Sequence, residues 1–120
     1  MTIRVKRAYD PAGPEDGVRY LVDRLWPRGI TKENLKIAGW LRELSPSNEL
    51  RRWYNHDPLR WEEFKARYFA ELQGRPKIEK DISELRRHKT VTLLYSAKNR
   101  EINNAVALKM YLEKEFSRSK

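Results

Sequence analysis

The feature that most constrains the fold is the apolar run VTLLY at residues 91–95. Apolar side chains at successive positions over so short a length are typical of a strand that is buried on both faces. Such a strand lies inside a sheet and needs other elements to cover it on either side. We therefore expect residues 91–95 to form the central strand of an α/β fold.

Two further strands are expected earlier in the chain. Residues 2–8 alternate apolar and basic side chains, which is the period of a half-exposed strand at the edge of a sheet. Residues 18–26 have a Leu-Val centre and predict a second interior strand, which Pro27 and Gly29 would end. The residues between these strands hold two prolines and two glycines and are expected to form a loop.

Amphipathic stripes predict helices over most of the remaining chain. Thr31, Ser45 and Asp57 are expected N-caps, and the last two precede a proline that suits the first helical position. The expected helices cover residues 32–44, a short segment opening at 46, residues 58–73, a stretch through residues 78–85, and residues 102–117. Residues 1–120 are thus predicted to form a single α/β domain, with a small, mostly parallel sheet of about three strands and about five helices packed around it.

The cysteine and histidine content limits the kinds of catalytic and metal site that we expect. The chain has no cysteine, which excludes disulfides, thiolate zinc sites and cysteine nucleophiles. With two histidines, we expect no dedicated metal site and no cofactor. The N-terminal residues lack the apolar segment of a signal peptide, and no apolar run approaches a membrane-spanning length. We therefore expect a cytoplasmic protein without a membrane partner.

The formal net charge of +9 has two interpretations. A folded face that concentrates the excess charge would suit an anionic partner. Alternatively, the charges form a solvated surface laced with ion pairs, as in thermophilic proteins. The basic residues are spread along the chain without a basic tail, so the sequence leaves both interpretations open.

The segment VDRLWPRG at residues 22–29 is the first candidate site. Ligands of parallel sheets bind beyond the carboxyl ends of the strands, where charged and hydroxyl side chains from distant segments would converge. Arginine forks bind phosphate or carboxylate through two bonds, and Gly29 would let the backbone approach a ligand. The alternative is that Asp23 pairs with an arginine for structural reasons and Trp26 belongs to the core. The expected ligand-binding residues at this edge are Arg7, Asp23, Arg24, Arg28, Tyr95, Ser96 and Lys98.

Residues 51–57, with the sequence RRWYNHD, are the second candidate. Arg51 would be a further anion ligand. His56 is the best candidate for proton transfer near neutral pH, provided that an acid orients it. Asp57, however, precedes a proline and resembles a helix cap, which would occupy its carboxylate. His56 would then be a turn residue bonded to the backbone.

The loop that follows the strand at 91–95 is the third candidate. A loop between a strand and a helix presents free backbone N–H groups to an anion. This one lacks the glycines of a P-loop or a dinucleotide fingerprint, so neither nucleotide fold is indicated. Asn103 is an expected ligand-binding residue, and the alternative role for Asn103 or Asn104 is that of a helix cap.

Aromatic and basic residues are interleaved between residues 51 and 68. Such mixtures can stack on bases and bind phosphates of a nucleic acid. Trp61, Phe64 and Tyr68, however, share one helical stripe, and a stripe at that spacing is more often core than binding surface.

Four segments of the chain together resemble one family. They read VKRAYDP, DGVRYLVDRLWPRG, LSPSNELRRWYNHDPLRWEEFKARYFAEL and VTLLYSAKNREINNAVAL, and they are similar to the domain of unknown function 488 family in its short YeaO-like branch. The resemblance implies a small α/β fold and brings no established activity with it. Two positions depart from the family pattern, because Asn99 stands where an acid is usual and Asn104 where a histidine is usual. A catalytic role for that histidine would call activity of this chain into question, whereas a capping role would not.

Two functions from different classes follow. The leading prediction is a protein that binds a small anionic, phosphate-bearing ligand at the carboxyl edge of its sheet, and the sequence leaves open whether a reaction is catalysed. The alternative is a nucleic-acid-binding accessory protein that uses a diffuse basic surface, with an affinity that falls steeply as salt rises. A homodimer with exposed aromatic side chains at its interface is a third, structural prediction.

Overall fold

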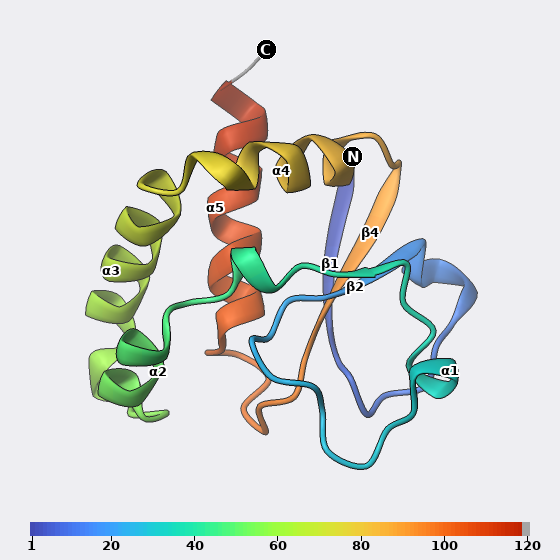
Figure 1. The fold of residues 1–120 in the computed structure, drawn as a ribbon, viewed down its shortest axis with the longest axis horizontal. Helices are drawn as coiled ribbons and strands as arrows, with labels where there is room; N and C mark the ends of the chain where they lie inside the picture. Colours follow the sequence, from blue (N-terminus) through green and yellow to red (C-terminus); the bar gives the residue numbers. More distant parts are fainter. Residues whose placement is uncertain (119–120) are drawn as a thin grey trace.

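The computed structural model describes residues 1–118, which fold into strands and helices (Figure 1). Short 3₁₀ turns at Pro14–Asp16, Arg42–Leu44, Pro58–Arg60 and Pro76–Ile78 connect the main elements. The elements in chain order are β1 (Thr2–Arg7), β2 (Val18–Leu21), α1 (Lys32–Leu35), β3 (Gly39–Trp40), α2 (Asn48–Tyr54), α3 (Trp61–Gln73), α4 (Glu79–Arg86), β4 (Thr90–Tyr95) and α5 (Asn104–Arg118). The predicted α/β class is confirmed.

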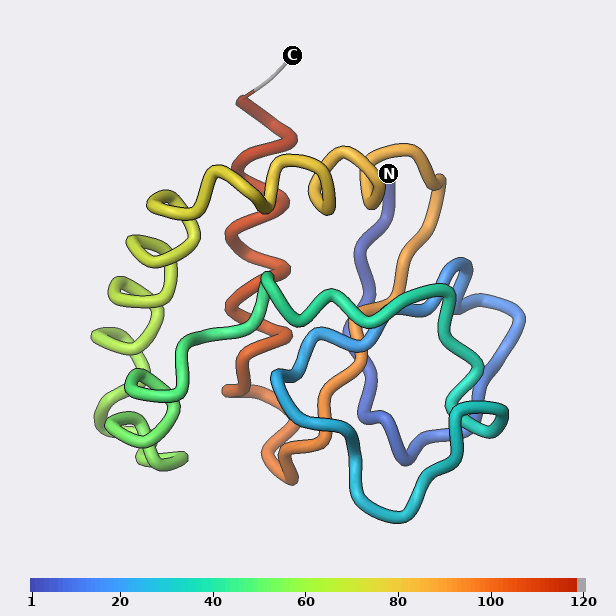
Figure 2. Tube along the Cα trace, viewed as in Figure 1, coloured from blue at the N-terminus to red at the C-terminus, as the bar shows by residue number. Residues whose placement is uncertain are grey.

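The four strands form one sheet in the order β1-β4-β2-β3, and every neighbouring pair is parallel. β4 lies inside the sheet and β1 at its edge, as the apolar run and the alternating pattern predict. The register places Arg7 beside Tyr95, and Leu21 beside both Leu94 and Trp40. The carboxyl ends of the strands therefore lie together, and Figure 2 shows the segments that follow β2 and β4 at the same end of the molecule.

The two faces of the sheet are covered differently. Helices α2 to α5 pack on one face, where Tyr20, Val91 and Leu93 meet the buried side chains of the helices in the main core. On the other face Leu21 and Leu94 pack with Leu35 of α1 in a smaller core. Figure 1 shows α3, α4 and α5 on one side of the strands and α1 on the other. Covering on both faces is what the apolar sequence of β4 requires.

The helix expected over residues 32–44 is wrong beyond its first turn. α1 ends at Lys36, which adopts a left-handed conformation with φ of 54°. The chain then runs along β2, where Leu41 N donates to the Leu21 carbonyl oxygen at 2.8 Å. Trp40 packs in the smaller core and Leu41 in the main core, so the apolar residues of this segment divide between the two faces of the sheet. The segment forms the unexpected two-residue strand β3 and the 3₁₀ turn at Arg42–Leu44 instead of one helical stripe.

Three other boundaries differ from the prediction. The strand expected over residues 18–26 ends at Leu21, and the next residues bend away. α2 is capped by Ser47, whose hydroxyl accepts from Leu50 N, and not by Ser45, which is buried. The segment after Asp57 begins as a 3₁₀ turn before α3, although Asp57 caps it as expected by accepting from Leu59 N at 3.0 Å.

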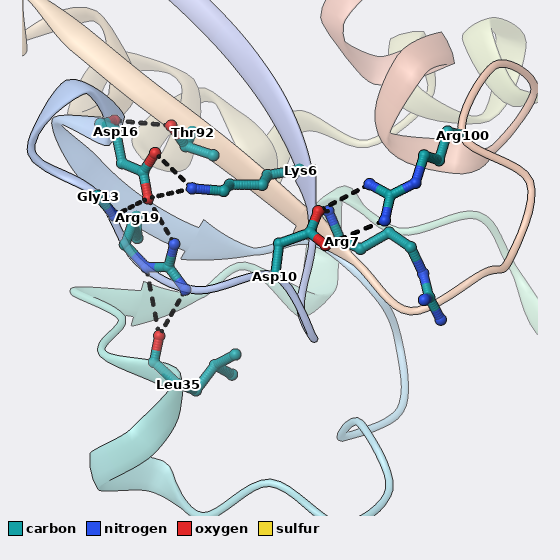
Figure 3. A network of polar contacts seen from close by, with 9 residues as sticks. All are labelled: Lys6, Arg7, Asp10, Gly13, Asp16, Arg19, Leu35, Thr92 and Arg100. Atoms are coloured by element: carbon teal, nitrogen blue, oxygen red, sulfur yellow. Dashed lines mark hydrogen bonds and ion pairs between the residues drawn. The ribbon is translucent and has the colours of Figure 1, made fainter.

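A buried network of ion pairs and hydrogen bonds connects strands of the sheet with one another and with α1 (Figure 3). The Asp16 carboxylate, which is inaccessible to solvent, accepts from Lys6 at 3.1 Å and from Arg19 at 2.6 Å. Arg19 also donates to the Leu35 carbonyl, and the Thr92 hydroxyl donates to the Asp16 carbonyl. The network joins β1, β2, β4 and α1, so it ties the sheet to the helix that covers its smaller core.

Among residues 1–118, no helix is both long and apolar enough to span a membrane.

Candidate anion-binding site

A pocket of about 950 Å³ lies at the carboxyl ends of the strands. We call the lining residues at the end of β1 and in the segments that follow β1, β2 and β4 the sheet-edge wall, and those of α2, the turn after it and the start of α3 the helical wall. Its lining residues are Arg7, Tyr9, Asp23, Arg24, Leu25, Trp26, Pro27, Arg28, Pro46, Arg51, Tyr54, His56, Phe64, Ser96, Ala97, Lys98, Asn99, Asn103 and Asn104. The pocket lies at the carboxyl edge where the sequence predicts a site, because the parallel topology brings residues distant in the chain together there.

Asp23 holds the sheet-edge wall together. One oxygen of its carboxylate accepts from Ser96 N at 2.9 Å and from the Ser96 hydroxyl at 2.8 Å. The other oxygen accepts from Asn104 Nδ2 at 2.9 Å. The expectation that Asp23 would pair with an arginine is therefore wrong, because its carboxylate joins the end of β2 to the loop after β4 and to α5.

Arg7 and Asn103 shape the loop between β4 and α5. The Arg7 guanidinium donates to the carbonyl oxygens of Ala97 at 2.9 Å and Ser96 at 3.0 Å. Asn103 caps α5, since its side-chain oxygen accepts from Val106 N at 2.9 Å, and its amide donates to the Asn99 carbonyl. Both residues line the pocket and hold the loop in place, and Arg7 uses two of its five N–H groups to do so.

The helical wall is anchored from α3. The Glu71 carboxylate accepts from the backbone N–H and the hydroxyl of Ser47, which fixes the first turn of α2. At the other end of α2, the Tyr54 ring stacks on Phe64 with centroids 4.2 Å apart. Arg51, one turn before Tyr54, also lines the pocket.

The cations of the pocket outnumber its carboxylates. Asp23 is the one carboxylate among the lining residues of the described chain, and its oxygens are already bonded. Within residues 1–118, the side chains of Arg28 and Lys98 are exposed and have no hydrogen-bond or ion-pair partner. Arg24 and Arg51 each donate one hydrogen bond, to the Pro46 carbonyl and to Asn48, and keep other N–H groups for a ligand.

Tyr54 is the pocket residue that the sequence did not single out. It is 6% exposed, and its hydroxyl is the one buried side-chain polar atom in the described part of the chain without a hydrogen-bond partner. Burial, and to a smaller extent the charge of Asp57, raises the pKa of this hydroxyl above its ordinary value. It therefore stays protonated at neutral pH and is a donor. No sequence pattern distinguishes such a tyrosine from a core aromatic.

Two predicted site residues are placed differently from expectation. Tyr95 is 2% exposed, belongs to the main core, and does not line the pocket. Because β4 is buried on both faces, its last side chain points into the helices, and burial raises the pKa of its hydroxyl. His56 does line the pocket, but the carboxylate expected to orient it belongs to Asp57, which caps the next turn and pairs with Arg60.

The interleaved aromatic and basic residues mostly belong to the core or contact one another at the surface. Phe64 and Tyr68 are buried, as their helical spacing indicates. The guanidinium groups of Arg60 and Arg67 lie over the Trp53 ring, at 5.3 Å and 4.2 Å from its centroid. The tryptophan best placed to stack on a base is thus already covered by the protein's own cations.

The pocket contains side chains of the kinds that bind anions in proteins. Guanidinium and ammonium groups next to a hydroxyl donor bind phosphate or carboxylate oxygens. No group of three or more His, Cys, Asp or Glu side chains suited to a metal ion lies within residues 1–118. The side chains free to meet a ligand are donors, and the pocket's one carboxylate has a structural role.

Comparison with known proteins places the chain among small bacterial relatives. A family model described as the inactive DUF488-N3 subclade matches residues 2–120. The uncharacterized protein YeaO of Escherichia coli is 43% identical over 112 residues, which cover 93% of this chain and 97% of YeaO. The uncharacterized protein Rv3073c of Mycobacterium tuberculosis is 49% identical over 70 residues, which cover 58% of this chain and 59% of that protein. No solved structure matches the chain.

Proposed function

The chain belongs to the DUF488 family, as its motifs predict, and from this premise we propose that it is a binding protein that holds a small phosphate-bearing anion at the carboxyl edge of its sheet without transforming it. The observation that carries the proposal is the pair of unpartnered cations, Arg28 and Lys98, in a pocket whose single carboxylate is already bonded within the protein.

The charge balance of the pocket supports an anionic ligand. Arg28 comes from the segment after β2 and Lys98 from the loop after β4, so two independent parts of the chain place a cation at one pocket. Arg24 and Arg51 add donors from the same edge and from the helical wall. A concave site lined by one sign of charge focuses its field and attracts ligands of the opposite sign.

Two features support binding without turnover. His56 lacks an orienting carboxylate, since Asp57 is engaged as a cap. Asn104 stands where the resembled family usually has a histidine, and its amide lies 2.9 Å from the Asp23 carboxylate. An amide in this position keeps a hydrogen bond to Asp23 but cannot exchange a proton as an imidazole does. The description of the matching subclade as inactive agrees with this proposal.

The test is a calorimetric titration with inorganic phosphate at low ionic strength. We expect Arg28→Ala to weaken phosphate binding about tenfold, because a charge-assisted hydrogen bond is lost. The matched control is Arg4→Ala, which removes the same charge from an exposed residue of β1 outside the pocket and should change the affinity less than about twofold. Wild-type protein that does not bind phosphate, or equal losses in the two variants, would contradict the proposal.

A further inference from the structure

Building on the proposed function, we propose that the bound anion is part of an organic phosphate and not an inorganic oxoanion. The body of this ligand carries an apolar ring and a hydrogen-bond acceptor for Tyr54, which is the chemistry of a nucleoside monophosphate. Three properties of the pocket lead to this ligand class: its size, the apolar side chains at its rim, and the unpartnered hydroxyl in its helical wall.

The pocket is much larger than an inorganic anion. Its volume of about 950 Å³ lies at the upper end of the range of about 300–1,000 Å³ that is usual for sites of organic ligands. The free cations belong to the sheet-edge wall, whereas the opposite wall offers Phe64 and Tyr54. A phosphate group held at Arg28 and Lys98 would leave the space along the helical wall to the rest of the ligand.

Apolar side chains line the same pocket in unusually exposed positions. Leu25 is 60% exposed and Tyr9 is 44% exposed, and both lie at the pocket with Trp26 and Pro27. Most large apolar side chains in the described residues are buried, so two exposed ones beside one pocket indicate a surface that a ligand covers. An inorganic anion would gain nothing from these side chains, whereas the ring of an organic phosphate would bury them.

Tyr54 supplies the hydrogen-bond donor. A buried hydroxyl without a partner destabilises a folded protein, and such groups are rare unless a ligand or water satisfies them. Because this hydroxyl stays protonated, its complement is an acceptor, such as a ring nitrogen or carbonyl oxygen of the ligand.

The turn after Tyr54 provides the route to this hydroxyl. Asn55 and His56 both adopt left-handed conformations, with φ of 47° and 55°, which are disfavoured for L-residues. The His56 ring lies 6.3 Å from the Tyr54 ring, centroid to centroid, and also lines the pocket. The hydroxyl is buried in this structure, so this turn has to move before a ligand acceptor reaches it.

The number of free cations favours a phosphate monoester over a carboxylate. A phosphate monoester carries close to two negative charges at neutral pH, because its second pKa is about 6. A carboxylate carries a single charge and would leave one positive charge of the two unpartnered cations uncompensated. Arg28 and Lys98 together balance the monoester, and Arg24 can add a further donor.

The experiment compares inorganic phosphate with the four common nucleoside monophosphates by calorimetry on the full chain. At least one nucleotide is expected to bind ten times more tightly than phosphate. Tyr54→Phe should remove about tenfold of that nucleotide's affinity, leave phosphate binding unchanged, and leave the thermal melting temperature equal or higher, because an unsatisfied hydroxyl is deleted. The control Tyr111→Phe deletes a hydroxyl on α5 outside the pocket and should change neither affinity.

The outcomes separate this inference from the function on which it rests. Phosphate binding with no nucleotide preference, or a preference that Tyr54→Phe leaves intact, overturns the ligand class and leaves the anion site standing. Failure of both phosphate and nucleotides to bind overturns both proposals.

Discussion

Replacing Asp16 with alanine is expected to lower the free energy of unfolding by about 3–5 kcal/mol, the range found when one partner of a buried ion pair is removed. The Asp16 carboxylate is closed to solvent and is the shared partner of Lys6 and Arg19 (Figure 3). Its loss leaves the Arg19 guanidinium buried with one carbonyl partner and no counter-charge. Urea denaturation followed by tryptophan fluorescence measures the change.

Glu63→Ala is the control for this effect. Glu63 also pairs with an arginine, Arg67, but both side chains are more than half exposed, at 55% and 52%. Exposed pairs contribute about 0–1 kcal/mol, so the control should change stability little. Similar losses in the two variants would show that the Asp16 network does not stabilise the sheet as described.

The same carboxylate gives stability a defined dependence on pH. Burial tends to raise the Asp16 pKa, but hydrogen bonds from the Gly13 N–H, Lys6 and Arg19 outweigh burial and hold the pKa below its ordinary value. A lowered pKa in the folded state contributes stability that is fully present above the unfolded-state pKa of about 3.9 and disappears as pH falls through the lowered value. We expect acid unfolding to include this loss, and Asp16→Asn to remove that part of the pH dependence.

Asp23→Ala is the second substitution with a large expected effect. It removes the acceptor of three hydrogen bonds, and leaves both Ser96 donors and one of the two Asn104 amide N–H groups unpaired, while the Asn104 amide keeps its bond to the Val22 carbonyl. We expect the free energy of unfolding to fall by about 3 kcal/mol, because each unpaired part-buried donor costs about 1 kcal/mol or more. Phosphate affinity should fall more than tenfold, since the loop that carries Lys98 loses its anchor.

Asp57→Ala is the matched control for that prediction. Asp57 caps the 3₁₀ turn at Pro58–Arg60 through a single backbone hydrogen bond, and loss of a cap typically costs about 1 kcal/mol. Asp57 does not line the pocket, so phosphate affinity should stay unchanged. If Asp23→Ala cost no more than Asp57→Ala and still bound phosphate normally, the structural role of Asp23 would be refuted.

The sequence was sufficient to predict the fold where a residue pattern is compatible with one structure only. The apolar run of β4 requires an interior strand, and the alternation in β1 requires an edge, which together imply a covered sheet. Parallel strands then place Arg7, Asp23 and Ser96 at one end, so the position of the pocket follows from the fold class and not from any catalytic motif.

The sequence was insufficient where the outcome depends on tertiary partners. Residues 37–44 carry a helical spacing, yet hydrogen bonds to β2 hold Gly39 and Trp40 in β3 and divide the apolar side chains of the segment between both faces of the sheet. Asp23 could have bonded an arginine or a hydroxyl, and only the fold brings Ser96 and Asn104 to it. Tyr54 resembles any core tyrosine until its hydroxyl is found without a partner.

The central claim is that a phosphate-bearing anion binds at the carboxyl edge of the sheet. It is tested most directly by titrating ¹⁵N-labelled wild-type protein with inorganic phosphate and following the backbone amide resonances. The account predicts saturable shifts concentrated in residues 24–28 and 96–99, with the amides of α4 unmoved. Shifts spread over the whole chain without concentration at these residues, or no shifts at a large excess of phosphate, would contradict it.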